Sequence, residues 1–584
     1  MEKNTIYAIV LSALVIIGFS TYQMRVQANA MEAEALAAEQ AAAEAVLVEE
    51  SAEVAASSLF SADTDVAAET IKEETITITT NLMNITLTNK GGDIISYELR
   101  DHKDQDAGIQ MADLITNTNR AFAIALGSEN APIINDCFNV KRISDYCVSF
   151  ARTFNAKADN GGTRTVTLIK QYTFLPDEYT FKLDVYLQGA DGMVYSLRTA
   201  PQIGPRWDTK NRYDYRYFMS LTNGKVKRQN LAAGQTKEYN GDYSWTGVAG
   251  KYFAALVAPV NGQTTTKAAY STKLDADDNA TSQVTLVRNP ISGNTVTDTY
   301  YIYLGPKTDK TLKMYNHAAD NGWKLDGLYY DYCQQSSGFL TWLEVALKWI
   351  MGIIYKLVPN WGLCILIMTL LLRLALYPMT KKTSLSSVKM QQVQPKMQAL
   401  QEKYKSNPDR LNQEMAALYK ETGYNPMSGC LPMLIQFPII IAMYNLFNNY
   451  FDFRGATFIP GWIPDLSQGD SVYTLGFNLP FLGNEIRLLP VIYVVIQVLQ
   501  TKIMSKTQPQ TAQTKSMNTM MYVMPFMFFF MFYNAPSGLV IYWTFSMVVA
   551  VIQQLFINKQ VKAAREALEA EEAAKPKFVA RKKK

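Results

Sequence analysis

The 584-residue chain has only two histidines and five cysteines. His102 and His317 lie far apart, and neither is near a cluster of cysteines or carboxylates at ligand spacing, so we expect no metal site. The sequence also lacks the Gly-x-x-x-x-Gly-Lys pattern of a phosphate-binding loop, and no nucleophile and base stand in a familiar local pattern. These absences argue against an enzyme that hydrolyses nucleotides, and we expect no cofactor and no catalytic residues.

The cysteines give little guidance about disulfides. Three of them, Cys333, Cys364 and Cys430, lie in or beside apolar segments. Cys137 and Cys147 share a polar region and could form a disulfide in an oxidising compartment, but the sequence does not fix their geometry.

The sequence is rich in long apolar runs, and 48% of its residues are hydrophobic. Ile6 to Tyr22 follows Lys3 and predicts either a signal peptide or a retained transmembrane anchor. The cleavage-like Ala28-Asn29-Ala30 lies well beyond the run, with Arg25 between, which favours an anchor over residues 1–25. Residues 26–70 are rich in Ala and Glu and read as a tether.

Residues 71–335 alternate apolar and polar side chains in short runs separated by Gly, Asn and Asp turns. Thr75 to Thr79 and Tyr179 to Leu187 are examples of this period of two. So many short strands predict one large antiparallel β-sandwich outside the cytoplasm. We expect a structural or docking role for it.

Residues 339–358 predict an amphipathic helix. Its polar residues include Glu344 and Lys348, which fall on one stripe, and Trp342 belongs to its apolar remainder. We expect this helix to lie in the membrane interface, because a spanning helix here would move the lysine-rich loop that follows to the wrong side of the membrane.

The next apolar run, Trp361 to Thr380, is long enough to span a bilayer but contains Arg373. At about 1.5 Å per residue, Arg373 lies about 18 Å below Trp361 in a hydrocarbon layer of about 30 Å. A guanidinium at that depth predicts a functional site. The alternative is that the side chain snorkels toward the boundary near Lys381 and Lys382.

A basic loop and further apolar segments complete the chain. Residues 381–425 carry eight Lys or Arg against four acids and predict an antiparallel helical hairpin that turns at Asn407-Pro408. Further spans are predicted at Leu431 to Leu446, Leu488 to Met504, Met517 to Tyr533 and Leu539 to Ile557. With the anchor and the Arg373 helix, this makes six transmembrane helices, five of them in a core over residues 361–557.

The tail, residues 558–584, is basic and ends in Arg581, Lys582, Lys583 and Lys584. A mobile basic end suits ribosomal RNA or anionic lipid, and solubilising charge is the alternative. The charge distribution places both termini and the hairpin in the cytoplasm and the β-domain in the periplasm, since the loop from Phe451 to Glu485 has a single basic residue, Arg454.

Three motifs resemble one known family. They are Arg373-x-x-x-Tyr-Pro-x-Thr380, Asn425-Pro-x-x-Gly-Cys-x-Pro-x-Leu-Ile-Gln-x-Pro438, and Pro536-Ser-Gly-Leu-Val540. In this order they are similar to the YidC/Oxa-type membrane insertases, in the form found in the inner membrane of Gram-negative bacteria. The region from Phe339 to Lys559 carries the similarity, whereas the first 330 residues match in layout only.

The resemblance implies a hydrophilic groove, open to cytoplasm and lipid, that inserts nascent membrane proteins without nucleotide. It implies partners among nascent chains, the Sec translocon, the ribosome (through the basic tail and hairpin) and anionic lipid. The implied groove residues are Arg373, Gln436 and Trp543, with polar Gln497, Gln500 and Asn518 beside them. Asn534 stands where some relatives have tryptophan. Two other classes stay open: a polytopic transporter or channel, and an envelope assembly protein that works through its β-domain.

Overall fold

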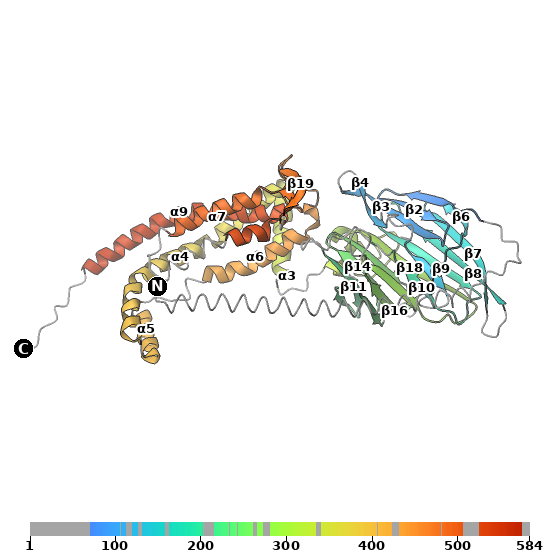
Figure 1. Cartoon of the computed structure of the whole chain (residues 1–584), viewed down its shortest axis with the longest axis horizontal. Coiled ribbons are helices and arrows are strands. Elements are labelled where there is room, and N and C mark those ends of the chain that lie inside the picture. The colour runs from blue at the N-terminus through green and yellow to red at the C-terminus, as the bar shows by residue number, and fades with distance from the viewer. Residues whose placement is uncertain are drawn as a thin grey trace, which may run out of the picture. The chain divides into compact units, whose positions relative to one another are not determined.

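The computed structural model describes residues 71–574 apart from internal gaps, so the predicted anchor, the tether and the last ten residues lie outside it. The gaps are residues 105–106, 113–119, 127–130, 158–162, 201–202, 204–214, 233, 242, 261–264, 273–280, 335–339, 406, 423–430, 480–481 and 506–524. The described residues form two compact units, one up to Gln334 and one from Leu340 onward (Figure 1). Each unit is described by itself.

The first unit is built from antiparallel sheets. A nine-stranded sheet has the order β12-β11-β14-β15-β18-β9-β8-β7-β6, a five-stranded sheet the order β13-β16-β17-β10-β5, and a four-stranded sheet the order β1-β2-β3-β4. Their strands are β1 (Thr75–Thr79), β2 (Met83–Thr88), β3 (Asp93–Asp104), β4 (Ala107–Ala112), β5 (Ala123–Leu126), β6 (Asn139–Ser144), β7 (Cys147–Lys157), β8 (Thr163–Thr173), β9 (Thr180–Gln188), β10 (Tyr195–Arg198), β11 (Arg216–Thr222), β12 (Lys225–Gln229), β13 (Thr236–Asn240), β14 (Trp245–Gly250), β15 (Phe253–Pro259), β16 (Thr265–Ser271), β17 (Gln283–Arg288) and β18 (Thr295–Pro306). Short helices α2 (Asp309–Lys313), η2 (Met314–Asn316) and η3 (Tyr330–Gln334) follow.

The period of two in the sequence fixes which face of each strand is buried. In β9 the residues from Phe181 onward alternate between buried and half-buried, with Leu183, Val185 and Leu187 fully buried. The alternation confirms the β-rich domain that the sequence predicts before the helical region.

Polar side chains join the five- and nine-stranded sheets face to face. The Tyr195 hydroxyl on β10 donates to Asp298 Oδ2 on β18 at 2.6 Å, and Arg288 Nε on β17 donates to the same oxygen at 2.6 Å. Phe218 on β11 stacks on Tyr270 on β16, with ring centroids 4.9 Å apart. The two sheets therefore share one core, as in a sandwich.

A buried charge cluster joins the four-stranded sheet to the nine-stranded one. Lys170 on β8 is fully buried, pairs with Asp93 on β3 and donates to the Phe122 carbonyl oxygen at 2.8 Å. Arg120 contributes a second cation, 3.4 Å from Asp93 Oδ2. Burial lowers the pKa of Lys170, while the Asp93 charge opposes that shift.

The two cysteines of the first unit considered for a disulfide are free thiols. The register pairs Ser144 with Cys147 and Asn139 with Ala151, so Cys137, two residues before Asn139, lies about six residues along β7 from Cys147. That separation is about 20 Å at about 3.3 Å per residue, too far for an S–S bond.

The second unit consists of helices and one small β-ribbon. Its elements are α3 (Thr341–Leu357), α4 (Trp361–Lys403), α5 (Pro408–Thr422), α6 (Leu431–Asn449), η5 (Phe451–Phe453), β19 (Tyr473–Leu479), β20 (Gly483–Ile486), α7 (Leu489–Ser505) and α9 (Ser537–Ala574), and residues 525–532 are also helical. Helix α9 packs along both α4 and α7, and α3 packs against α4 and α6.

Helix α4 is longer than the sequence predicts. It continues from the predicted span into the basic segment without a break, through Pro378 and Pro395, and ends at Lys403. At about 1.5 Å per residue its 43 residues measure about 65 Å, roughly twice the thickness of a hydrocarbon layer. The first arm of the predicted hairpin is therefore the end of the membrane helix.

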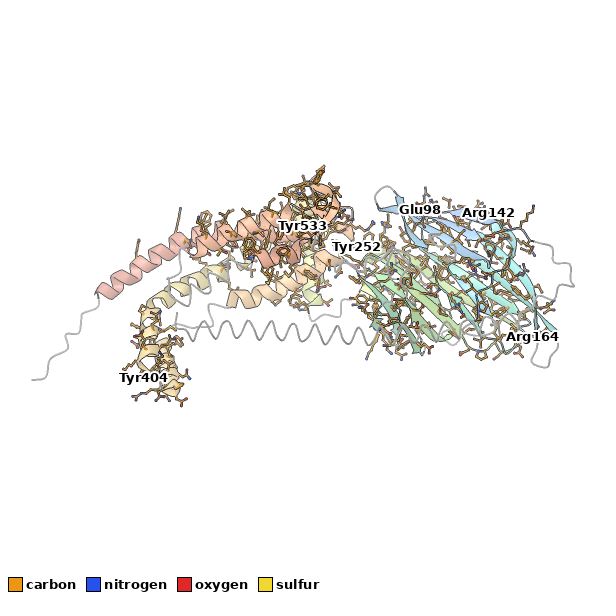
Figure 2. All side chains as sticks on the ribbon, viewed as in Figure 1. Glu98, Arg142, Arg164, Tyr252, Tyr404 and Tyr533 are labelled. Carbon is orange, nitrogen blue, oxygen red and sulfur yellow. The ribbon has the colours of Figure 1, made fainter. Side chains whose placement is uncertain are left out.

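The turn of the hairpin forms where the sequence predicts it. The Asn407 side chain accepts a bond from the Arg410 amide at 3.2 Å, and α5 begins at Pro408. Tyr404 lies at this turn (Figure 2), and the Arg410 guanidinium lies 5.7 Å from the centre of its ring.

Helix α9 likewise extends beyond its predicted end at Ile557, to Ala574. The first part of the predicted basic tail is therefore helical, because the Ala- and Glu-rich sequence there favours helix. Two described helices are long and apolar enough to cross a membrane, over Trp361–Lys381 and Ser537–Gln560, and Leu489–Ile503 is a shorter apolar helix. The count of six spans stays a prediction.

Candidate functional site

Arg373 is held between two helices of the second unit. Its guanidinium donates twice to the Ser546 hydroxyl on α9, from Nε at 2.8 Å and from Nη2 at 2.6 Å. Its own carbonyl oxygen accepts a bond from Gln553 Nε2 at 3.1 Å. Among the described residues Arg373 forms no ion pair, so its charge is bonded to a neutral hydroxyl.

These contacts fix the direction in which the side chain points. Helices α4 and α9 both begin at the loop that precedes α7. Gly362, near the start of α4, lies so close to this loop that a Cβ atom on it would be 2.0 Å from Phe458. The amide of Gly538, at the start of α9, donates to the Leu466 carbonyl in the same loop at 3.0 Å. The two helices therefore run in parallel, as Figure 1 shows. The main chain of Arg373 is level with Gln553, but its guanidinium reaches Ser546, seven residues nearer the start of α9. The charge points away from Lys381 and Lys382, opposite to the direction that snorkelling requires.

Trp543 belongs to an aromatic cluster between α9 and α7. The centre of its ring lies 4.1 Å from that of Phe532 in an edge-on arrangement and 6.4 Å from that of Tyr493 on α7. Trp543 precedes Ser546 by three residues, which places it about 60° around the helix. Trp543 and Ser546, the residue that binds Arg373, thus lie on neighbouring faces of α9.

Gln497 lies one turn beyond Tyr493 on α7. Its Oε1 atom is buried and has no hydrogen-bond partner among the described residues. Gln500 is half-buried one turn further along. Gln497 follows Tyr493 by four residues and so lies on the face of α7 from which Tyr493 contacts Trp543 of α9.

The polar stripe of α3 faces neighbouring protein of the second unit. Asn445 Nδ2 on α6 donates to Glu344 Oε1 at 2.7 Å, and the Lys348 ammonium lies 5.3 Å from the centre of the Tyr450 ring. Trp342 and Trp349 are exposed instead. The apolar side of α3 is left to face its surroundings, as in a helix lying against lipid.

A loop closes the end of the bundle where α4, α7 and α9 begin. Asp470 is buried, and its Oδ2 accepts from the amides of Leu488 and Leu489 at 2.7 and 2.9 Å and from Trp462 Nε1 at 2.9 Å. The Ser537 amide, at the start of α9, donates to the Gln468 carbonyl at 2.6 Å. The loop thus occupies the N-terminal ends of two helices at once.

A second set of contacts locks the same end. Arg487 Nη1 donates to the Asp470 carbonyl at 2.9 Å, and Arg487 Nε donates to Asn534 Oδ1 at 3.2 Å. The Tyr533 hydroxyl, at the position labelled in Figure 2, donates to the Glu485 carbonyl at 2.8 Å. Asn534 therefore has a polar role at this end of the bundle.

Several predicted site residues fall outside the described part of the chain. They are Asn518, the side chain of Gln436, and the terminal Arg581, Lys582, Lys583 and Lys584. Ser546, Gln553 and Asp470 are residues that sequence reasoning missed. Ser546 follows Tyr542 by four residues, and Gln553 follows Ser546 by seven, so the three share one face of α9. Only the packing of α9 on α4 identifies Arg373 as the partner of Ser546 and Gln553.

Two family models match the chain. One, described as the 60Kd inner membrane protein, matches residues 353–565, and one, described as the YidC periplasmic domain, matches residues 75–349. Among curated proteins, the membrane protein insertase YidC of Treponema denticola is 43% identical over 590 residues, covering 96% of this chain and all of that protein. The membrane protein insertase YidC of Treponema pallidum (strain Nichols) is 37% identical over 619 residues, covering 96% of this chain and 99% of that protein.

Some solved structures resemble part of the chain distantly. A galactose mutarotase-like protein from Lactobacillus casei covers 40% of this chain and 100% of its own, with a TM-score of 0.31 and 11% identity. A likeness of that degree supports no functional comparison.

Proposed function

The chain belongs to the YidC family of membrane protein insertases, inner-membrane proteins with a periplasmic domain, and from this premise we propose that it inserts nascent membrane proteins and helps them fold. The site is a hydrophilic groove beside α9, lined by Arg373, Trp543 and Gln497. Gln436, Gln500 and Asn518 contribute further polar groups to it.

The direction of the Arg373 guanidinium is the observation that carries this proposal. A charge inside a membrane helix costs several kcal/mol unless water or a partner reaches it. This guanidinium points away from Lys381 and toward the start of α9, where it bonds to the neutral Ser546 hydroxyl. It therefore keeps its full positive charge available to an acidic residue of an incoming segment.

The packing of the helices supports a groove beside α9. Helices α4 and α7 each pack against α9, and within the described residues they do not pack along one another. The buried Gln497 oxygen, which has no hydrogen-bond partner within the part of the chain that the structure describes, lies on the α7 side, and the Arg373–Ser546 contact lies on the α4 side. Only fourteen residues separate Arg487 from Lys502, about 21 Å of helix, which is less than a hydrocarbon layer of about 30 Å, so we infer a locally thinned bilayer.

A polar groove and a thin bilayer lower the cost of moving a short hydrophilic segment across the membrane. The apolar segment of the same substrate leaves the groove into lipid, at about 25 cal/mol per Å² of apolar surface removed from water. This transfer supplies the free energy, so no nucleotide hydrolysis is required.

We extend the proposal to topology and partners. Six membrane helices place both termini and the α4–α5 hairpin in the cytoplasm, with the β-domain in the periplasm. The hairpin and the basic tail then face ribosomes and anionic lipid, and some substrates arrive through the Sec translocon.

Site-specific crosslinking of ribosome-bound nascent chains tests the groove. A photoreactive residue at position 543 or 436 should crosslink to a short nascent membrane protein. Val495 is the matched control, because it lies on α7 near the same cluster but is 54% exposed on the outside of the helix. Equal crosslinking at positions 495 and 543, at every nascent-chain length, would contradict a groove beside α9.

A further inference from the structure

The ribbon formed by β19 and β20 leaves an apolar face uncovered. Tyr473, Leu475, Phe477 and Leu479 alternate along β19 with small or polar residues. Tyr473 pairs with Ile486 on β20, so both side chains stand on the same face. Tyr473 and Phe477 are each 63% exposed and Ile486 is 39% exposed.

The side of the ribbon that carries Thr474 and Glu485 is polar at its base. Thr474 pairs with Glu485, and its hydroxyl donates to Glu485 Oε1 at 3.2 Å. Ser471 also donates to the Glu485 carboxylate. The ribbon thus has a polar pair at its base beside the exposed Tyr473, Phe477 and Ile486, and its register shifts between Thr474 and Leu479.

The base of the ribbon is fixed to the helical bundle. The Glu485 carbonyl is bound by Tyr533, and Arg487 is bound to Asp470 and Asn534. The ribbon therefore has a set position at the end of the unit where α4 and α9 begin, where Figure 1 places β19.

The exposed apolar surface continues from the ribbon into a membrane helix. After Ile486, the exposed residues Leu488, Val491, Val495 and Leu499 follow at spacings of three or four, which makes one stripe along α7. In an inner-membrane protein, such a stripe on an apolar helix faces lipid. The apolar face of the ribbon extends this lipid-facing surface at its outer end.

We propose that the apolar face of the β19–β20 ribbon lies in the headgroup region of the leaflet at the starts of α4, α7 and α9. There it anchors the start of α7 to the membrane surface. Tyrosine and phenylalanine are side chains suited to that boundary. The ribbon stays at headgroup depth, because the outer edges of two strands carry unpaired amides and carbonyls that need water.

Depth-dependent quenching tests this placement in the full chain. All five cysteines are replaced by serine or alanine in a variant shown to keep insertion activity, and an environment-sensitive fluorophore is attached through Phe477→Cys. The protein is reconstituted into vesicles of phosphatidylethanolamine and phosphatidylglycerol. Thr474→Cys is the matched control, because Thr474 is exposed on the polar face three residues away.

The fluorophore at position 477 should be quenched several-fold more by shallow doxyl lipids than by aqueous iodide, and more by shallow than by deep doxyl lipids. At position 474 iodide should be the stronger quencher. Strong iodide quenching at 477 would overturn the proposal by placing the face in water. Protection at 477 from both iodide and doxyl lipids would overturn it in favour of a protein cover, such as a second copy of the chain.

Hydroxyl-radical footprinting of the unaltered chain in nanodiscs of the same lipids needs no substitution. Tyr329, in the first unit, is 39% exposed and serves as an aqueous reference for Tyr473, which is 63% exposed. If lipid covers the ribbon, Tyr473 should be oxidised several-fold more slowly than Tyr329. Faster oxidation of Tyr473 would contradict the proposal.

Discussion

Replacing Asp470 should open the closed end of the helical bundle. One oxygen of this buried carboxylate accepts three hydrogen bonds, from Trp462 and from the first two amides at the start of α7. Asp470→Ala removes the acceptor and leaves these donors without a partner. At about 1.5 kcal/mol for each bond to a charged acceptor, the loss is about 4 to 5 kcal/mol.

The conservative substitution separates geometry from charge. Asp470→Asn retains an acceptor oxygen at the start of α7 and loses only the favourable interaction of a negative charge with the helix end, about 1 kcal/mol. Asp465→Ala is the matched control, because Asp465 lies in the same loop, but its side chain bonds only to nearby Ser467 and Gln468. We expect it to cost about 1 kcal/mol or less.

Two measurements check this ordering. Denaturant titration of the purified chain should rank the loss of unfolding free energy as Asp470→Ala, then Asp470→Asn, then Asp465→Ala. Hydrogen exchange at the Leu488 and Leu489 amides should accelerate strongly in Asp470→Ala and little in Asp465→Ala. If Asp470→Ala and Asp465→Ala are equally stable and exchange alike, the loop is not held to α7 by this carboxylate.

Three other predictions follow from the two units. Arg373→Lys should keep most insertion activity, because lysine retains the positive charge. The attraction between that charge and an acidic residue 4 Å away, in a medium of effective dielectric about 20, is worth about 4 kcal/mol before desolvation. Arg373→Ala should impair substrates with acidic translocated segments more than neutral ones, and equal insertion of both at normal expression would refute the groove role. Burial raises the pKa of Tyr179 to about 12, whereas an unfolded tyrosine titrates near 10. Its contribution to the stability of the β-domain is therefore full below pH 10 and is lost as the pH rises toward 12. An unfolding free energy of the β-domain that stays constant over this range would contradict that. Removing Lys575 to Lys584 should weaken ribosome co-sedimentation more at low salt than at high salt, and binding unchanged across the salt titration would leave this segment as solubilising charge only.

The sequence by itself determined the local structure where the signal is short in range. The alternation in β9 predicts its buried face, and Asn407-Pro408 predicts the start of α5, because both depend on residues a few positions apart. The position of Arg373 within an apolar run, and the three motifs of the family, likewise follow from neighbouring residues. The chemical character of the site is therefore a property of short stretches of the chain.

Only the tertiary structure decided what these residues contact. The run of α4 through two prolines, the pairing of Arg373 with Ser546 across 173 positions, and the polar stripe of α3 turned toward α6 all depend on which helices pack together. The same holds for Asp470, which no sequence pattern singles out but whose carboxylate accepts the Leu489 amide at the start of α7. Hydrophobic periodicity predicts that a face is buried but not which element covers it, because the hydrophobic effect is non-directional. A hydrogen bond, in contrast, needs a particular partner within about 3 Å, and only the fold supplies that partner.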